Sequence, residues 1–118
     1  MKYILIILLF FVAISCRKDK VQEVVPVEGE CSEERSFSQD VLPILNTNCT
    51  TSGCHDSSTQ SGGYTFENFE QVDQHAVIML SAMKHESAVL NMPQNLPKLA
   101  DSLIETFDCW IKQGKLNN

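Results

Sequence analysis

Two cysteines stand close together near the middle of the chain, and a histidine directly follows the second one. They are Cys49, Cys54 and His55, in the segment CTTSGCH. Covalent attachment of haem requires this combination, because each thiol adds to one vinyl group and the adjacent histidine then binds the iron beneath the ring. The usual spacing is C-x-x-C-H, whereas four residues separate the cysteines here. Gly53 and its small or polar neighbours let such a loop bulge without displacing the Cys54–His55 pair.

The N-terminus has the pattern of a lipoprotein export signal. Lys2 precedes the apolar run 3–14, which is too short for a membrane span of about 20 residues. Ala13 and Ser15 place small residues just before Cys16, which resembles a bacterial lipobox. The sequence therefore predicts a signal peptide over 1–15, a lipidated Cys16 and an exported protein anchored to a bacterial membrane on its periplasmic or cell-surface side. The outer membrane is favoured because no aspartate follows the cysteine.

Two other kinds of chemistry suit the same central residues. Cys49 and Cys54 would form a disulfide in a surface loop, with His55 incidental. Alternatively, both thiolates and His55 would bind zinc together with His75 or His85, a reading that the cysteine spacing permits. Export to an oxidising compartment and the helical surroundings argue against zinc.

Composition limits the size and the partners of the protein. A chain of 118 residues with a formal net charge of −6 allows one small domain and offers no basic surface for nucleic acid. Residues 17–35 combine a short basic cluster with five glutamates and show no lasting helical or strand period. They are expected to form a flexible tether. The compact domain is then 36–118.

Three stretches of this domain have the apolar spacing of helices. The first covers 39–48 behind a cap at Ser38, and the second covers roughly 66–80. The third and clearest runs from Leu99 to Ile111, with Asp101 expected as its cap.

Loops and turn residues separate these stretches. Gly114 is placed as a stop after the third helix, and Pro43 is tolerable within the first turn of the first. The segments 48–64 and 91–97 are rich in Gly, Ser, Thr and Pro, and no strand pattern occurs. The fold class is therefore all-α, with three main helices and long loops. Domains of this size usually need a disulfide, a metal or a cofactor as support.

Four short motifs follow one another along the domain. They are SFSQDVLPIL at 36–45, CTTSGCH at 49–55, MP at 92–93 and WIKQG at 110–114. Their order resembles the small class I-like cytochrome c domains of bacterial exported proteins, including a C-x4-C-H subgroup. The resemblance covers about 36–118.

The resemblance implies a cytochrome c-like fold around one covalent haem c. Cys49 and Cys54 would hold the haem, with His55 as the proximal ligand and Met92 as the distal ligand to the iron. Trp110 and its helix would pack against the first helix and the haem edge. The pocket is expected to contain Leu45, Tyr64, Phe66, Phe69, Leu90 and Leu103.

The sixth ligand has rivals within the chain. Pro93 restricts Met92 to an extended backbone that suits a side chain held over the ring, whereas Met79 and Met83 fit the second helix as core residues. His75 or His85 would instead give bis-histidine ligation. A third alternative is an open coordination position.

Two cysteines remain after these assignments. The resemblance implies packing of the terminal helices, which would bring Cys31 and Cys109 together as a disulfide. The alternative is a buried Cys109 thiol, with Cys31 in the tether.

The expected function is transfer of single electrons by a membrane-anchored cytochrome that is not an enzyme. Redox partner proteins would present basic patches to its acidic surface. Two other functions fit the sequence. One is a haem-based sensor or weak peroxidase with an open sixth position, and the other is a haem-free lipoprotein stabilised by disulfides.

Overall fold

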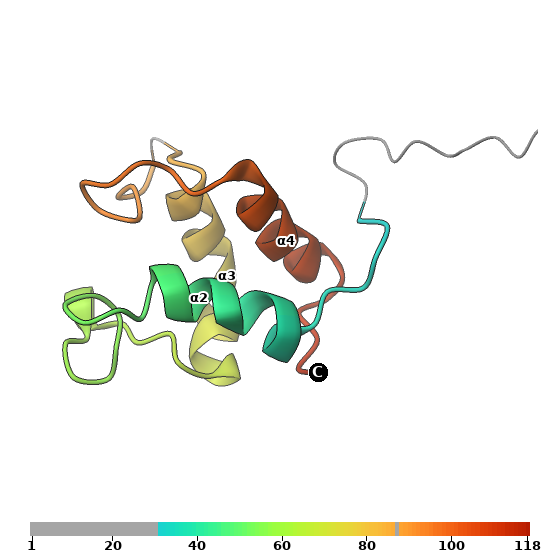
Figure 1. The fold of residues 1–118 in the computed structure, drawn as a ribbon, viewed down its shortest axis with the longest axis horizontal. Helices are drawn as coiled ribbons and strands as arrows, with labels where there is room; N and C mark the ends of the chain where they lie inside the picture. The colour runs from blue at the N-terminus through green and yellow to red at the C-terminus, as the bar shows by residue number, and fades with distance from the viewer. Residues whose placement is uncertain (1–30, 87) are drawn as a thin grey trace, which may run out of the picture.

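The computed structural model describes residues 31–86 and 88–118. The predicted signal peptide 1–15, Cys16 and the tether segment 17–30 lie outside these residues. Helices dominate the described part (Figure 1), and no strand occurs in it, so the predicted all-α class is confirmed. The elements are η1 (Phe37–Val41, a π-helix), α2 (Leu42–Asn48), η2 (Ser61–Gly63, a 3-10 helix), α3 (Phe69–Met83) and α4 (Asp101–Lys112). None of these helices is long and apolar enough to cross a membrane.

The first helical segment begins at Phe37, so the predicted cap at Ser38 is wrong. Ser36 has an extended backbone, and its Oγ accepts a hydrogen bond from the Gln39 N–H at 3.2 Å. Ser38 lies inside the helix, where its own N–H donates to the Asn118 carbonyl at 2.9 Å. The π-helix η1 then continues into α2, whose first turn contains Pro43 as predicted.

The other two helices begin one to three residues away from the predicted positions. Asn68 caps α3 by accepting from the Gln71 N–H at 3.1 Å, so Phe66 precedes the helix although its side chain is buried. Asp101 is not the cap of α4. The Ala100 carbonyl accepts the first helical bonds, which makes Ala100 the cap residue and Asp101 the first helical residue. Its carboxylate still favours the positive end of the helix.

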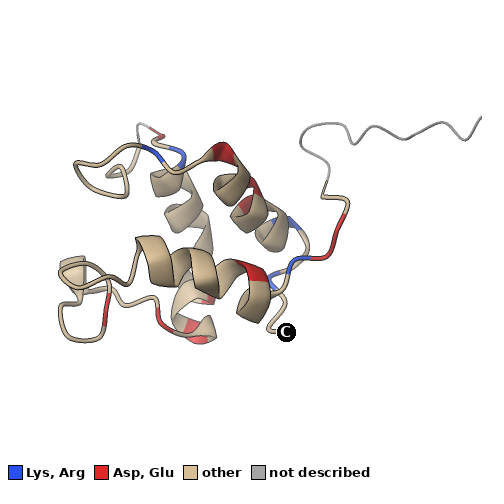
Figure 2. Ribbon diagram, in the orientation of Figure 1, with Lys and Arg blue, Asp and Glu red and all other residues tan. Residues whose placement is uncertain are grey.

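Charged residues are scarce in the two long loops (Figure 2). Asp56 is the single charged residue between 49 and 64, and 88–97 contains none. Both loops leave the helices at the end of the molecule opposite the C-terminus (Figure 1). One end of the fold is therefore formed by loops that carry almost no charge.

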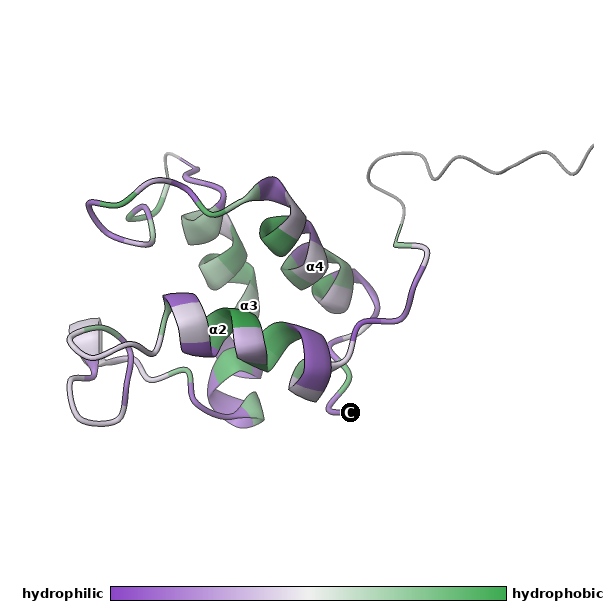
Figure 3. Ribbon diagram, viewed as in Figure 1, coloured by the Kyte–Doolittle hydropathy of each residue, from purple (hydrophilic) through white to green (hydrophobic). Residues whose placement is uncertain are grey.

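The core lies where α4 packs on both η1 and α3. The Trp110 ring is fully buried and lies 5.7 Å from the Phe37 ring and 6.3 Å from the Phe69 ring. Its indole N–H donates to the Leu116 carbonyl at 2.9 Å. Figure 3 shows the apolar stripes of the helices from which this core is made. The predicted packing of the Trp110 helix against the first helix is thus present.

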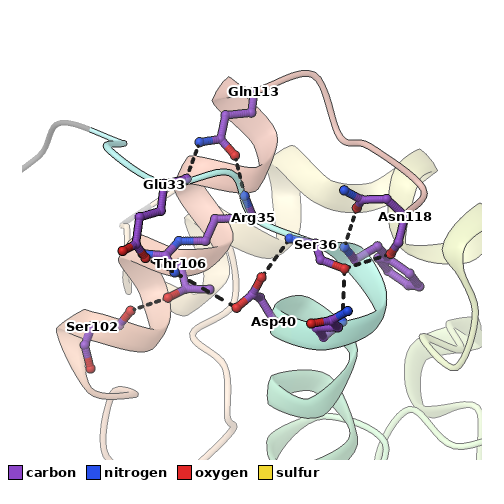
Figure 4. A network of polar contacts seen from close by, with 10 residues as sticks. Glu33, Arg35, Ser36, Asp40, Ser102, Thr106, Gln113 and Asn118 are labelled. Atoms are coloured by element: carbon purple, nitrogen blue, oxygen red, sulfur yellow. Dashed lines mark hydrogen bonds and ion pairs between the residues drawn. The ribbon is translucent and has the colours of Figure 1, made fainter.

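The two ends of the described chain are fastened to each other. Cys31 and Cys109 form a disulfide with a Cα–Cα distance of 5.4 Å, which confirms the predicted pair. Gln113 accepts from the Arg35 N–H and donates to the Glu33 carbonyl, both at 2.8 Å (Figure 4). Residues 31–35, which composition had placed in the tether, are therefore held against α4.

Asn118 continues this network on the other side of the chain (Figure 4). Its side-chain oxygen accepts from the Phe37 N–H at 3.0 Å, and its carbonyl accepts from the Ser36 hydroxyl at 2.8 Å. The C-terminal residue thus satisfies donors at the start of η1 that have no partner inside the helix.

We expect Cys31→Ser to destabilise the domain considerably. The disulfide spans 78 residues, and opening a loop of that length costs roughly 4–5 kcal/mol in the chain-entropy model. Urea unfolding of the variant under non-reducing conditions should show this loss, and Cys31→Ser/Cys109→Ser should lose a similar amount. A loss below about 1 kcal/mol would mean that the polar network alone holds the two ends.

Candidate functional site

Two adjoining hollows open between α3 and the two long loops. Their volumes are about 270 and 230 Å³. Cys49, His55 and Met92 line both hollows, and Cys54 lines the second. Both are also lined by Ser61, Met83 and Gln94. The two hollows together are called the cavity below. The structure brings Cys49, Cys54, His55 and Met92 to this cavity, although Met92 lies far from the other three along the chain.

Among the residues that the structure describes, no Asp, Glu, Lys or Arg side chain lines the cavity. The apolar wall of the first hollow comes from Phe66, Ile78, Met79, Ala82, Val89 and Leu90. Ile78, Leu90 and Leu96, the last from the second hollow, are 55 to 63% exposed. An apolar cavity with exposed apolar residues at its margin is a typical binding site for an apolar ligand or partner.

Half of the predicted pocket residues line this cavity. Tyr64, Phe66 and Leu90 do so, whereas Leu45, Phe69 and Leu103 do not. Leu45 is fully buried in the helical core, and the Phe69 ring packs edge-on to Phe37 at 5.3 Å. Trp110, which was expected at the haem edge, lines neither hollow and lies in the same aromatic cluster.

One face of α3 supplies wall residues that, apart from the rival ligand His75, the sequence reasoning did not assign to the pocket. His75, Ile78, Met79, Ala82 and Met83 all line the first hollow. Their spacing of three and four residues was the available signal, but it is the spacing of any buried helix face. Met79 and Met83 are buried as predicted for core residues, and they also form the cavity wall.

The cysteine loop is closed by its own backbone. The Cys49 N–H donates to the Leu45 carbonyl at 2.7 Å, which ends α2, and the His55 N–H donates back to the Cys49 carbonyl at 2.9 Å. Gly53 has a φ of +89°, a value that side chains disfavour. The longer spacing is therefore absorbed by a turn that keeps Cys54 and His55 beside Cys49.

The two thiols of the loop form no disulfide with each other. Burial, with a smaller contribution from the neighbouring Cys54 thiol, raises the pKa of Cys49 to about 11. Cys49 is thus a protonated thiol at neutral pH. In the described part of the chain, no three His, Cys, Asp or Glu side chains gather as a metal site.

The His55 ring is held in an orientation that suits a ligand. Its Nδ1 lies 3.2 Å from the Tyr64 carbonyl oxygen, and a carbonyl can only accept, so Nδ1 carries the hydrogen. The other nitrogen, Nε2, then keeps its lone pair for a metal. The ring also lies 4.7 Å from the Phe66 ring, and the Phe66 N–H donates to the His55 carbonyl at 3.1 Å.

The candidates for a sixth ligand differ in their hydrogen bonds and in whether they line the cavity. The main-chain N–H and carbonyl of Met92 are both hydrogen-bonded to the end of α3. His75 lines the first hollow, and its Nδ1 lies 2.8 Å from the Gln71 carbonyl, which leaves Nε2 without the hydrogen. His85 lines neither hollow, and its Nε2 lies 3.2 Å from the Met92 carbonyl. His75 is therefore the rival to Met92.

The donor set and the cavity fit a covalent haem. Two thiols, one imidazole and one thioether line an uncharged, largely apolar space. Comparison of the chain with protein-family models, with curated proteins and with solved structures found no match.

The raised pKa of Cys49 predicts the pH dependence of its alkylation in haem-free protein. Because only the thiolate reacts, the rate with iodoacetamide should rise about tenfold per pH unit until it levels off near pH 11. Tandem mass spectrometry of the 49–54 peptide separates this cysteine from Cys54. In urea, the plateau should begin near the ordinary thiol pKa of 9.0. A plateau near that value in folded protein would show that Cys49 is open to water.

Proposed function

We propose that this chain is a membrane-anchored c-type cytochrome with a cytochrome c-like fold, which carries single electrons through one covalent haem. The observation that supports this most directly is the convergence of Cys49, His55 and Met92 on one uncharged cavity, with Cys54 beside them. Packing of α4 on η1 is compatible with the proposed fold, in which the terminal helices meet.

Each of the four residues has a definite task in this proposal. The Cys49 and Cys54 thiols would form thioether bonds to the haem, and the His55 Nε2 would bind the iron as the proximal ligand. The Met92 sulfur would be the distal ligand. A haem held in this way supplies a reversible one-electron change between Fe(II) and Fe(III).

The wall of the cavity sets the expected redox behaviour. A thioether ligand favours Fe(II), and an apolar wall disfavours the additional charge of the ferric state. Both effects raise the reduction potential. With His55 and Met92 both bound, no coordination position remains for a substrate, so electron transfer is favoured over a sensor, a peroxidase or any other enzyme.

The charge distribution suggests the kind of partner. The loops around the cavity are almost uncharged, while the chain as a whole has a net charge of −6. In the described part of the chain, acidic residues lie mainly on the helices and at their ends (Figure 2). A redox protein with a basic patch around an apolar contact surface would complement this arrangement. Their association would then be fast and sensitive to salt.

The attachment of haem can be tested by a visible spectrum of denatured protein. We expect the full chain, produced in a host that matures c-type cytochromes, to retain its haem in denaturant and to show the α band of a thioether-linked haem when reduced. Cys49→Ser/Cys54→Ser should lose all haem on denaturation. Colourless wild-type protein from such a host would contradict the proposed function.

The sixth ligand can be identified by carbon monoxide binding to the reduced protein. We expect no binding to wild type, stoichiometric binding to Met92→Ala, and a lower reduction potential for that variant. Met79→Ala is the matched control, because Met79 also lines the cavity but lies within α3. Binding by His75→Ala instead of Met92→Ala would assign the sixth position to His75.

Membrane attachment is expected to depend on Cys16. Cys16→Ser should move the protein from the membrane fraction to the soluble fraction, since a diacylated cysteine supplies the two chains that stable anchoring requires. Ser15→Ala keeps a small residue before the cysteine and should remain in the membrane. Retention of the Cys16→Ser protein would point to an uncleaved N-terminal segment as the anchor.

A further inference from the structure

The C-terminus of α3 ends in a motif that usually requires glycine. The Glu86 N–H donates to the Ser81 carbonyl at 3.1 Å, and the His85 N–H donates to the Ala82 carbonyl at 3.2 Å. This pair of bonds is the Schellman motif, in which the residue after the cap adopts a left-handed backbone. That residue is His85, with a φ of +59°. A side chain at such a position costs conformational energy that glycine would not.

The His85 side chain makes a contact that glycine could not make. Its Nε2 lies 3.2 Å from the Met92 carbonyl oxygen. Since a carbonyl can only accept, the ring donates this hydrogen bond. The Met92 N–H in turn donates to the Ala82 carbonyl at 3.1 Å. Both main-chain polar groups of Met92 are thereby attached to the end of α3.

The end of α3 is fixed in the domain by burial and by an ion pair. Ala82 and Met83 are buried in the domain, and the Lys84 ammonium lies 3.1 Å from the Asp108 carboxylate of α4. By contrast, the residues that follow Met92 make few main-chain hydrogen bonds. From 93 to 97, the only main-chain bond within the segment joins the Leu96 N–H to the Pro93 carbonyl. The main-chain hydrogen bonds of Met92 are therefore the two that it makes with Ala82 and His85 at the end of α3.

We propose that His85 is a positioning residue that holds Met92 in the cavity, and is not itself a ligand. This inference rests on the proposed function, in which Met92 binds the haem iron. The hydrogen bond restricts the Met92 backbone, so the sulfur remains at the iron against competing ligands. Residues behind a metal ligand commonly act in this way on its orientation and affinity.

Two substitutions separate positioning from a merely structural role. His85→Gly and His85→Ala both remove the imidazole, but glycine relieves the left-handed backbone whereas alanine keeps it strained. We expect both variants to bind free imidazole at the ferric iron about fivefold more tightly than wild type, the effect of losing one hydrogen bond. In urea unfolding, His85→Gly should be clearly more stable than His85→Ala. His85→Gln, which can donate to the same carbonyl, should restore imidazole affinity to within about twofold of wild type.

The outcomes distinguish this inference from the proposed function. Wild-type imidazole affinity in His85→Gly would overturn the positioning role while leaving the cytochrome intact. Imidazole affinities that follow the stability of the variants would show that His85 acts only through the fold, and would also overturn it.

A second measurement covers the case in which the chain has no haem, where the proposed function has failed. Hydrogen exchange of the Met92 amide should then be about fivefold faster in His85→Gly than in wild type. Equal exchange rates would overturn the inference in that case as well.

Discussion

The packing of α4 on η1 is the interaction on which the rest of this small domain depends. Trp110 is fully buried between Phe37, Phe69 and Phe107. The disulfide joins Cys31, which precedes η1, to α4, and Asn118, which follows α4, accepts hydrogen bonds at the start of η1. Because η1 and α4 come from opposite ends of the domain, their contact holds the first and last helices together. The loops between the helices are then free to form the cavity.

The cavity is formed with little help from regular structure. Two loops and one helix face form its wall, and main-chain hydrogen bonds position the chemically important residues. The Tyr64 carbonyl orients the His55 ring, and the end of α3 binds both main-chain groups of Met92. Such bonds are modest individually, at about 1 kcal/mol each. Together they define a site in which each donor atom has a prepared orientation.

The cavity differs from the rest of the surface in its charge. Ion pairs such as Lys84–Asp108 and Lys115–Asp73 lie along the helices, while the loops at the cavity carry Asp56 as their single charge between 49 and 64. Exposed Ile78, Leu90 and Leu96 are costly in water and gain when an apolar ligand or partner covers them. A neutral, apolar end on an acidic protein is therefore an arrangement suited to binding.

The sequence by itself determined the helical class, the approximate helices and the cysteine–histidine segment, whereas the Cys31–Cys109 pair was only implied by the family resemblance and was decided by the structure. The first three follow from local spacing along the chain. Helix starts were less predictable, because Ser36 and Ser38 are both suitable cap residues. In the structure Ser36 accepts from the Gln39 N–H, whereas the Ser38 N–H bonds to Asn118 inside the helix. The tertiary structure alone decided that Phe69 and Trp110 belong to the core and that the α3 face with His75 and Met83 lines the cavity. It also decided that His85 bonds to Met92. Apolar periodicity shows that a helix face is buried, but what buries it depends on contacts between residues far apart in the chain.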